Sequence, residues 1–92
     1  MTKNFRIYSK EIKKQYLALK LFGDFDATSA CELIDILDDL VKENDKVAID
    51  TSGLKTINAF GLDVFLPRMS RLTRKLADIQ VIGRYSEAFM EG

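Results

Sequence analysis

The chain has 92 residues, of which 47% are hydrophobic and 30% charged, and its 14 basic residues balance 14 acidic ones. This length predicts one domain, residues 1–92, with a single hydrophobic core. A net charge of zero excludes a global attraction to nucleic acid or to an anionic membrane.

The first residues carry no apolar signal core, and no run of about 18 apolar residues occurs anywhere. We therefore expect a cytoplasmic protein that does not insert into the membrane. The chain has no histidine and one cysteine, Cys31, so it lacks the ligands of a zinc site and cannot form an internal disulfide. Cys31 lies in an apolar helical pattern and is expected to be a small, reduced core residue.

Two strands are expected first. Residues 5–8 alternate weakly, as in a short edge strand, and Tyr16–Phe22 form a stronger strand with Leu17, Leu19 and Leu21 on one face. The connection 9–15 is short and charged, which favours an antiparallel hairpin.

A loop, 23–29, leads to the first helix. Ser29 and Glu32 fit a capping box, although Asp26 or Thr28 could cap the helix equally well. Apolar residues then recur at helical spacing at Ala30, Leu33, Ile34, Leu37, Leu40 and Val41. The opposite, acidic face is interpreted as solvated surface, with a charged partner surface as the alternative. Asn44 is expected to end the helix in a left-handed conformation.

The third strand, Lys46–Thr51, has an apolar centre and should lie in the middle of the sheet. Because a helix between parallel strands makes a right-handed crossover, residues 16–51 are interpreted as one βαβ unit. A loop, 52–57, would then carry the chain to a second helix, for which Asn58 is a good N-cap.

The second helix is predicted from its apolar side, formed by Leu62, Phe65, Leu66, Met69, Leu72 and Leu76. Pro67 falls inside this pattern, so we expect a kinked helix with the proline exposed. Its outer face carries the basic residues Arg68, Arg71, Arg74 and Lys75. No aromatic residue interleaves with these charges, which favours solvated surface over nucleic-acid binding.

Residues 79–82 are expected to form a fourth strand, and Tyr85–Met90 one or two helical turns. The order ββαβαβ predicts an α/β fold with a mixed four-stranded sheet and helices packed mainly on one face.

Carboxylates follow two of the strands. Asp24, Asp26 and Asp50 could gather at one sheet edge and hold Mg²⁺, as in phosphoacceptor receiver domains. A receiver needs more βα units than this chain can supply, so we expect no metal, and we expect Asp24 and Asp26 to order the loop and the helix start.

Three motifs, in this order and spacing, carry a family resemblance. Residues 23–30, Gly-Asp-Phe-Asp-Ala-Thr-Ser-Ala, resemble the start of the STAS domain, named for sulphate transporters and anti-sigma factor antagonists. Residues 49–54, Ile-Asp-Thr-Ser-Gly-Leu, resemble a strand of that family, and residues 57–62, Ile-Asn-Ala-Phe-Gly-Leu, match its "I-D-S-S-G-L" loop. The resemblance covers about residues 5–83 and implies a STAS-like fold.

The resemblance also implies regulation by protein contact. Anti-sigma factor antagonists bind an anti-sigma factor that is a serine kinase of histidine-kinase-like fold, and phosphorylation of the first serine of this loop releases the partner. Here that position is Ala59, which has no hydroxyl; Asn58 replaces the acidic residue before it and Phe60 the serine after it. Thr56 and Ser52 are alternative phosphate acceptors, or they only bond the turn backbone.

The sequence therefore predicts a non-enzymatic STAS-like module without a cofactor or metal, bound to a protein and not to nucleic acid. Phe60 either plugs the core or supplies a contact surface. A scaffold subunit of a transporter, lipid-transport or stress-signalling assembly is the alternative. A second copy could close an apolar groove near Tyr85, Phe89 and Met90, giving a homodimer. The expected partner-binding residues are Asp24, Asp26, Thr28, Ser52, Thr56, Asn58, Ala59, Phe60 and Gly61.

Overall fold

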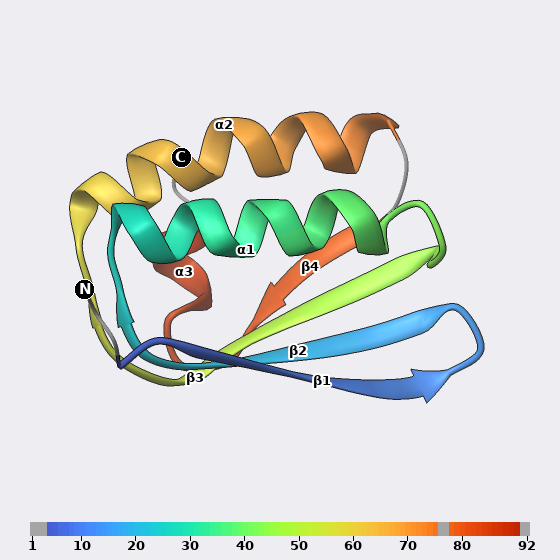
Figure 1. Cartoon of the computed structure of the whole chain (residues 1–92), viewed down its shortest axis with the longest axis horizontal. Helices are drawn as coiled ribbons and strands as arrows, with labels where there is room; N and C mark the ends of the chain where they lie inside the picture. The colour runs from blue at the N-terminus through green and yellow to red at the C-terminus, as the bar shows by residue number, and fades with distance from the viewer. Residues whose placement is uncertain (1–3, 76–77, 91–92) are drawn as a thin grey trace.

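The computed structural model describes residues 4–75 and 78–90, and these form a sheet with helices on one face (Figure 1). The elements in chain order are β1 (Arg6–Lys13), β2 (Tyr16–Phe25), α1 (Ala27–Leu40), β3 (Lys46–Ile57), α2 (Ala59–Lys75), β4 (Asp78–Ile82) and α3 (Ser86–Met90). The strands lie side by side in the order β1-β2-β3-β4. β1 pairs antiparallel with β2, whereas β2–β3 and β3–β4 are parallel. The mixed α/β sheet with ββαβαβ order is confirmed.

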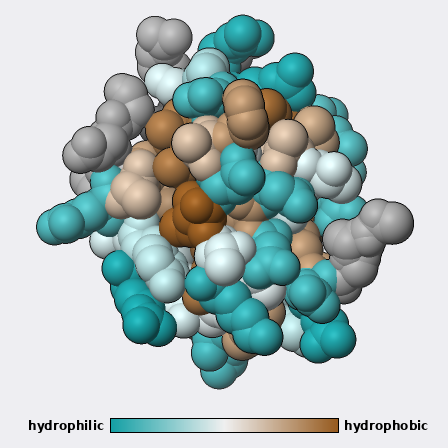
Figure 2. All heavy atoms as spheres, turned by 90° about the vertical axis from the view of Figure 1, so that its left-hand side faces the viewer, coloured by the Kyte–Doolittle hydropathy of each residue, from teal (hydrophilic) through white to brown (hydrophobic). Residues whose placement is uncertain are grey.

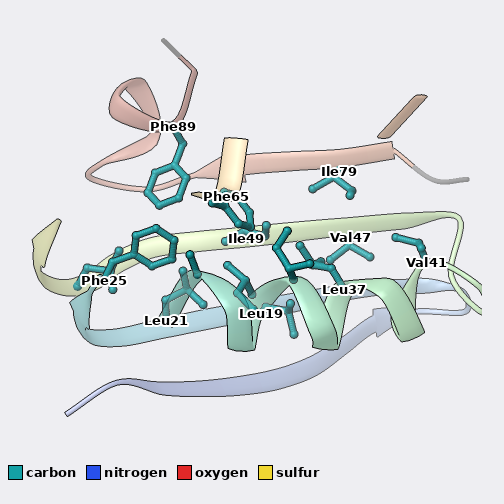
Figure 3. Close-up of a cluster of buried hydrophobic side chains, with 14 residues drawn as sticks. Leu19, Leu21, Phe25, Leu37, Val41, Val47, Ile49, Phe65, Ile79 and Phe89 are labelled. Atoms are coloured by element: carbon teal, nitrogen blue, oxygen red, sulfur yellow. The ribbon is translucent and has the colours of Figure 1, made fainter. Parts of the chain in front are cut away.

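The core lies between the sheet and the two long helices (Figure 3). Leu19 and Leu21 of β2 alternate inward as predicted, and Val47 and Ile49 of β3 pack beside them. At one end of the core, the rings of Phe25, Phe65 and Phe89 pack against one another with centroids 5.1–5.8 Å apart. These rings come from β2, α2 and α3, so they join three elements.

The strands run further than predicted. β1 continues to Lys13, and the hairpin turns at Gln15, which adopts a positive φ of 62°. β2 continues through Gly23 to Phe25, and residues 52–57 extend β3 instead of forming a loop. The extension forms because residues 22–25 pair in parallel with residues 53–57, with shifts in register that accommodate the turn-like composition.

Two local predictions about α1 are wrong. Asn44 does not adopt a left-handed conformation; its backbone N–H and its side-chain Nδ2 each donate to the Leu40 carbonyl at 3.0 Å and satisfy the helix end directly. Cys31 is exposed and not a core residue, because it lies one position beyond the buried Ala30 and so about 100° around the helix from the apolar stripe. The predicted apolar stripe itself is confirmed.

Helix α2 passes through Pro67, whose side chain is exposed as expected. Whether the helix kinks there stays a prediction, and Leu76 lies outside the described residues. Arg68 and Arg71 are exposed on its outer side. Within the described part of the chain, no helix combines the length and the apolar character required to cross a bilayer.

Candidate functional site

Both long helices start at the same edge of the sheet, directly after the carboxyl ends of β2 and β3 (Figure 1). Figure 2 views this edge face-on and shows apolar side chains gathered near its centre with hydrophilic ones around them. In α/β folds, such an edge is where loops and helix starts expose groups that can bind a partner or ligand. We refer to this surface, formed by residues 24–28 and 56–61, as the helix-start face.

The start of α1 is closed by its own side chains. Asp26 is the N-cap, and its carboxylate accepts a hydrogen bond from the backbone N–H of Ser29 at 2.9 Å. The Ser29 hydroxyl, which is buried, shares its hydrogen between the Asp26 carboxylate at 2.9 Å and the Asp24 carbonyl at 2.7 Å. Among the three caps predicted as alternatives, the structure selects Asp26, and Ser29 supports it.

The same contacts perturb the titration of Asp26. The pKa of this carboxyl is lowered from its ordinary value, first by the Ser29 backbone N–H and then by the Ser29 hydroxyl, because both stabilise the charged form. Asp26 is therefore a charged structural cap, and its carboxylate is already engaged inside the chain.

The start of α2 is held by its backbone. The side-chain oxygen of Asn58 accepts from the backbone N–H of Phe60 at 2.8 Å, and its carbonyl accepts from Gly61 at 2.9 Å, so Asn58 caps the helix as predicted. The Asn58 N–H donates in turn to the Phe25 carbonyl at 2.8 Å, which ties this helix start to β2.

Gly61 allows the two helix starts to meet. A Cβ at this position would lie 2.9 Å from the Asp26 carbonyl oxygen and 3.1 Å from the Phe25 ring. Gly61 is buried in that contact, so its place in the predicted partner-binding set has a packing explanation. It positions its neighbours and is not itself accessible.

Phe60 projects from this junction with 72% of its side chain exposed. The core-plug alternative is therefore excluded, since the core positions below it are occupied by Phe25 and Phe65. Asn58 and Ala59 beside it are also exposed. A large, rigid apolar side chain is thus presented next to the position that carries the phosphoserine in the family that the sequence resembles.

Asp24 and Thr56 close the other side of the helix-start face. The Thr56 hydroxyl donates to one Asp24 carboxylate oxygen at 2.8 Å, and the Asn4 side-chain amide donates to the other at 3.3 Å. Thr56 therefore contacts a side chain and not the turn backbone, and the residue is exposed. Thr28 is exposed in the first turn of α1.

Ser52 lies apart from this group. Its hydroxyl accepts from the backbone N–H of Arg84 at 3.1 Å, and its own N–H donates to Asp50 at 3.0 Å. It therefore belongs to the contact between β3 and the turn after β4. Asp50 is likewise used there, and no group of three or more His, Cys, Asp or Glu side chains that could hold a metal is found in residues 4–75 and 78–90.

Sequence reasoning missed Asn4 and the structural role of Phe25. Asn4 contacts Asp24 from 20 positions away, and no local pattern signals such a contact. Phe25 lies in the predicted loop 23–29, yet it ends β2 and is fully buried. Its apolar character between two acidic residues was the available signal.

A separate groove of about 760 Å³ lies between α2 and β4. It is lined by Leu66, Pro67, Met69, Ser70, Ile79, Gln80, Val81, Ile82 and Phe89. The sequence placed an apolar groove near Phe89, and Phe89 does contribute to it, although Phe89 itself is buried. Tyr85 does not line the groove; its backbone N–H donates to Thr51 at 2.9 Å.

No family model matches the chain, and no curated protein matches it either. Solved structures do. The anti-sigma factor antagonist SpoIIAA in its unphosphorylated form is 13% identical with a TM-score of 0.64, covering 83% of this chain and 71% of that one. An anti-sigma factor antagonist from Mycobacterium paratuberculosis is 16% identical with a TM-score of 0.68, covering 91% and 72%.

A third similar structure is an uncharacterised protein of the DUF3478 family, with a SpoIIAA-like fold, from Shewanella loihica. It is 17% identical with a TM-score of 0.64, covering 91% of this chain and 72% of that one. The chain therefore has the SpoIIAA-like α/β fold. This confirms the fold that the resemblance to STAS domains implied.

Proposed function

We propose that residues 1–92 act as one STAS-like regulatory module that binds a protein partner through the helix-start face. The partner proposed is a kinase-type anti-sigma factor, so the chain would act as an anti-sigma factor antagonist. The fold shared with antagonists of this kind supports the proposal, together with the exposure of Phe60.

The exposed Phe60 side chain is the observation that carries the proposal. A phenylalanine ring with 72% of its surface in water is an unfavourable arrangement that burial by a partner would relieve. Its backbone is fixed by the Asn58 cap and by the Gly61 contact, so little conformational entropy is lost on binding. Aromatic side chains held in this way are typical anchors of protein interfaces.

Ala59 makes the proposed interaction independent of phosphorylation at this position. A phosphate here would add about −1.5 to −2 charges at the helix start, which repels or desolvates a close partner. Because Ala59 has no hydroxyl, the module stays in its binding-competent form. Thr56 is a weaker substitute, since its hydroxyl donates to Asp24 and a phosphate there would face that carboxylate.

We also propose that the module works by binding and not by catalysis. The carboxylates of the helix-start face are engaged as a helix cap and as acceptors for Asn4 and Thr56. The sequence has no histidine to act as a general base.

The test is a pull-down from native lysate with the wild-type chain, Phe60→Asp and Tyr8→Asp, with captured proteins identified by mass spectrometry. Tyr8 is a matched control because it is also an exposed aromatic, but it lies in β1 and not at the start of a helix. We expect wild type and Tyr8→Asp to recover an ATPase of histidine-kinase-like fold and Phe60→Asp to lose it. Equal recovery by Phe60→Asp would show that the helix-start face is not the contact.

Modification is tested separately by intact mass after incubation with the captured kinase and ATP. We expect no phosphate on the wild-type chain and a single phosphate on Ala59→Ser. A phosphate on the wild-type chain that maps to Thr56 or Ser52 would contradict the loss of the switch.

The apolar groove between α2 and β4 favours a second candidate, a scaffold subunit that uses this groove to contact a second copy or a larger assembly. Recovery of a transporter or of a large homologous complex in the same pull-down, unaffected by Phe60→Asp, would support it over the antagonist.

A further inference from the structure

The face of the sheet opposite the helices is not covered by any described helix or strand (Figure 1). Residues of one parity point into the core, among them Leu19, Leu21 and Val47. The alternate residues therefore face away from the helices. We refer to this side of β1–β4 as the open sheet face.

Aromatic rings and cations alternate on the open sheet face. In the register of β1 and β2, Arg6 lies opposite Phe22, Tyr8 opposite Lys20, and Lys10 opposite Ala18. Tyr8 is 54% exposed and Phe22 37% exposed. The basic residues considered for nucleic-acid binding in the sequence are those of α2, and no aromatic residue interleaves with them.

The two rings form a fixed platform. Their centroids are 5.4 Å apart, and the ring planes are nearly perpendicular at 75°. Phe22 is seated against Gly53 of β3, where a Cβ would lie 2.4 Å from the ring. A hollow of about 260 Å³, lined by Lys20, Phe22, Asp50, Ser52 and Gly53, opens beside this ring. Tyr16 is not part of the platform, since the Lys46 ammonium lies 5.1 Å over its ring.

The hairpin that carries both rings is basic. Residues 6–22, the hairpin that carries both rings, contain five basic residues and one acidic residue, a net charge of +4. On the helix side, residues 27–43, which include α1, have a net charge of −4, and residues 59–75 of α2 have a net charge of +3. Charges separated by more than about 10 Å are largely screened at ordinary salt, so a partner at the two rings meets mainly the nearby charges. These are Arg6, Lys10 and Lys20, with the Asp50 carboxylate beside Phe22.

We propose that the open sheet face binds single-stranded nucleic acid, with bases stacking on Tyr8 and Phe22 and phosphates held by Arg6, Lys10 and Lys20. Stacking on exposed aromatic side chains beside cations is the common means of binding unpaired bases, and a four-stranded sheet presenting such rings is one known platform for RNA. An acidic protein would satisfy the cations but leaves the two rings without stacking partners. A nucleic acid strand matches both features.

The test is fluorescence anisotropy with labelled single-stranded RNA and DNA of about 10 nucleotides, a length within the usual range for one small domain. Duplex DNA of the same sequence is the comparison, because it has a higher charge density but no free base faces. We expect saturable binding of RNA, DNA or both single strands at about 50 mM salt, tighter than binding of the duplex. The affinity should fall with salt with a logarithmic slope of roughly −2, for about three phosphate contacts.

The variants separate stacking from charge. Tyr8→Ala should weaken single-strand binding about tenfold, whereas Tyr8→Phe keeps the ring and should retain it. Lys10→Gln should reduce the salt slope by about 0.7. Phe60→Ala should bind like wild type, so this experiment is independent of the proposed partner surface.

Three results would overturn the proposal. The first is no saturable binding of either single strand. The second is duplex binding equal to or tighter than single-strand binding with Tyr8→Ala unaffected, which would indicate attraction by charge alone. The third is a salt-dependent self-association of the chain that Tyr8→Ala abolishes, which would assign the open sheet face to the acidic helix of a second copy.

Discussion

The two long helices start side by side at the same sheet edge, but they differ in which side chains they expose there. The start of α1 is closed: Asp26 and Ser29 satisfy each other, and the Asp24 carbonyl accepts from the same hydroxyl. The start of α2 is equally well capped by Asn58 but presents Ala59 and Phe60 to solvent. One helix start therefore holds the sheet edge together, and the other exposes the side chains of the proposed partner surface.

The largest expected difference is between removing the buried ring of Phe25 and removing the exposed ring of Phe60. Phe25→Ala should lower the free energy of unfolding by about 3–5 kcal/mol, because Phe25 is fully buried and packs against Phe65 and Phe89. Phe60→Ala should change it by less than about 0.5 kcal/mol, because the side chain lies in water. Urea unfolding of both variants is the measurement. A large loss for Phe60→Ala would mean that this ring supports the fold.

A substitution at Gly61 tests whether the starts of α1 and α2 need their close contact. Gly61→Ala places a methyl group 2.9 Å from the Asp26 carbonyl oxygen, so we expect a loss of roughly 1–3 kcal/mol from forced displacement. Alanine would otherwise favour the helix by up to about 1 kcal/mol. The sign of the change in urea midpoint is therefore decisive, and a stabilised Gly61→Ala would show that the helix starts have room between them.

Substitutions of Asp26 should have a smaller effect on the free energy of unfolding, and this effect should depend on pH. Asp26→Ala should cost about 1 kcal/mol through loss of the cap, and Asp26→Asn should cost less because the amide oxygen still accepts a hydrogen bond. The pKa of Asp26 is lowered in the folded chain, so its stabilisation is present above the ordinary carboxyl pKa and is lost as pH falls through the lowered value.

When the free energy of unfolding is measured from pH 7 downwards, the difference between wild type and Asp26→Asn should therefore become smaller in acid. A difference that stays constant across this pH range would show that the charge of Asp26 does not stabilise the start of α1.

Ala59→Glu is expected to have the smallest effect on stability. A carboxylate in the first turn of α2 interacts favourably with the helix dipole and should raise the free energy of unfolding by about 0.3–1 kcal/mol. It should at the same time weaken partner binding by placing charge beside Phe60. Thermal unfolding and a binding titration on the same sample check the expected gain in stability and the expected loss of affinity. Unchanged binding would separate Ala59 from the recognition surface.

The order of the elements could be predicted because each has its own periodicity, as in Leu17, Leu19 and Leu21 or Leu33 and Leu37. The length of β3 could not, because Ser52 and Gly53 have turn composition and the strand continues only by pairing with residues 22–25 of a distant segment. The Asp26 cap was one of three local alternatives, and the buried contact of Ser29 with Asp24 decided among them.

The orientation of Phe60 followed only in part from local patterns. On an ideal helix, Phe60 lies about 140° around the axis from the fully buried Phe65, but only the observed Asn58 cap shows that Phe60 belongs to the helix. The open sheet face was missed for a related reason. Tyr8 and Phe22 become neighbours only when the hairpin register brings their strands together.

We propose that Phe60, at the start of α2, contacts a partner and contributes little to the stability of the fold. The most direct test is the dissociation constant of the captured partner for wild type and Phe60→Ala, measured by calorimetry beside the unfolding free energies of the two chains. We predict an affinity at least about tenfold weaker for Phe60→Ala with unchanged stability. Equal affinities in two equally stable chains would contradict it.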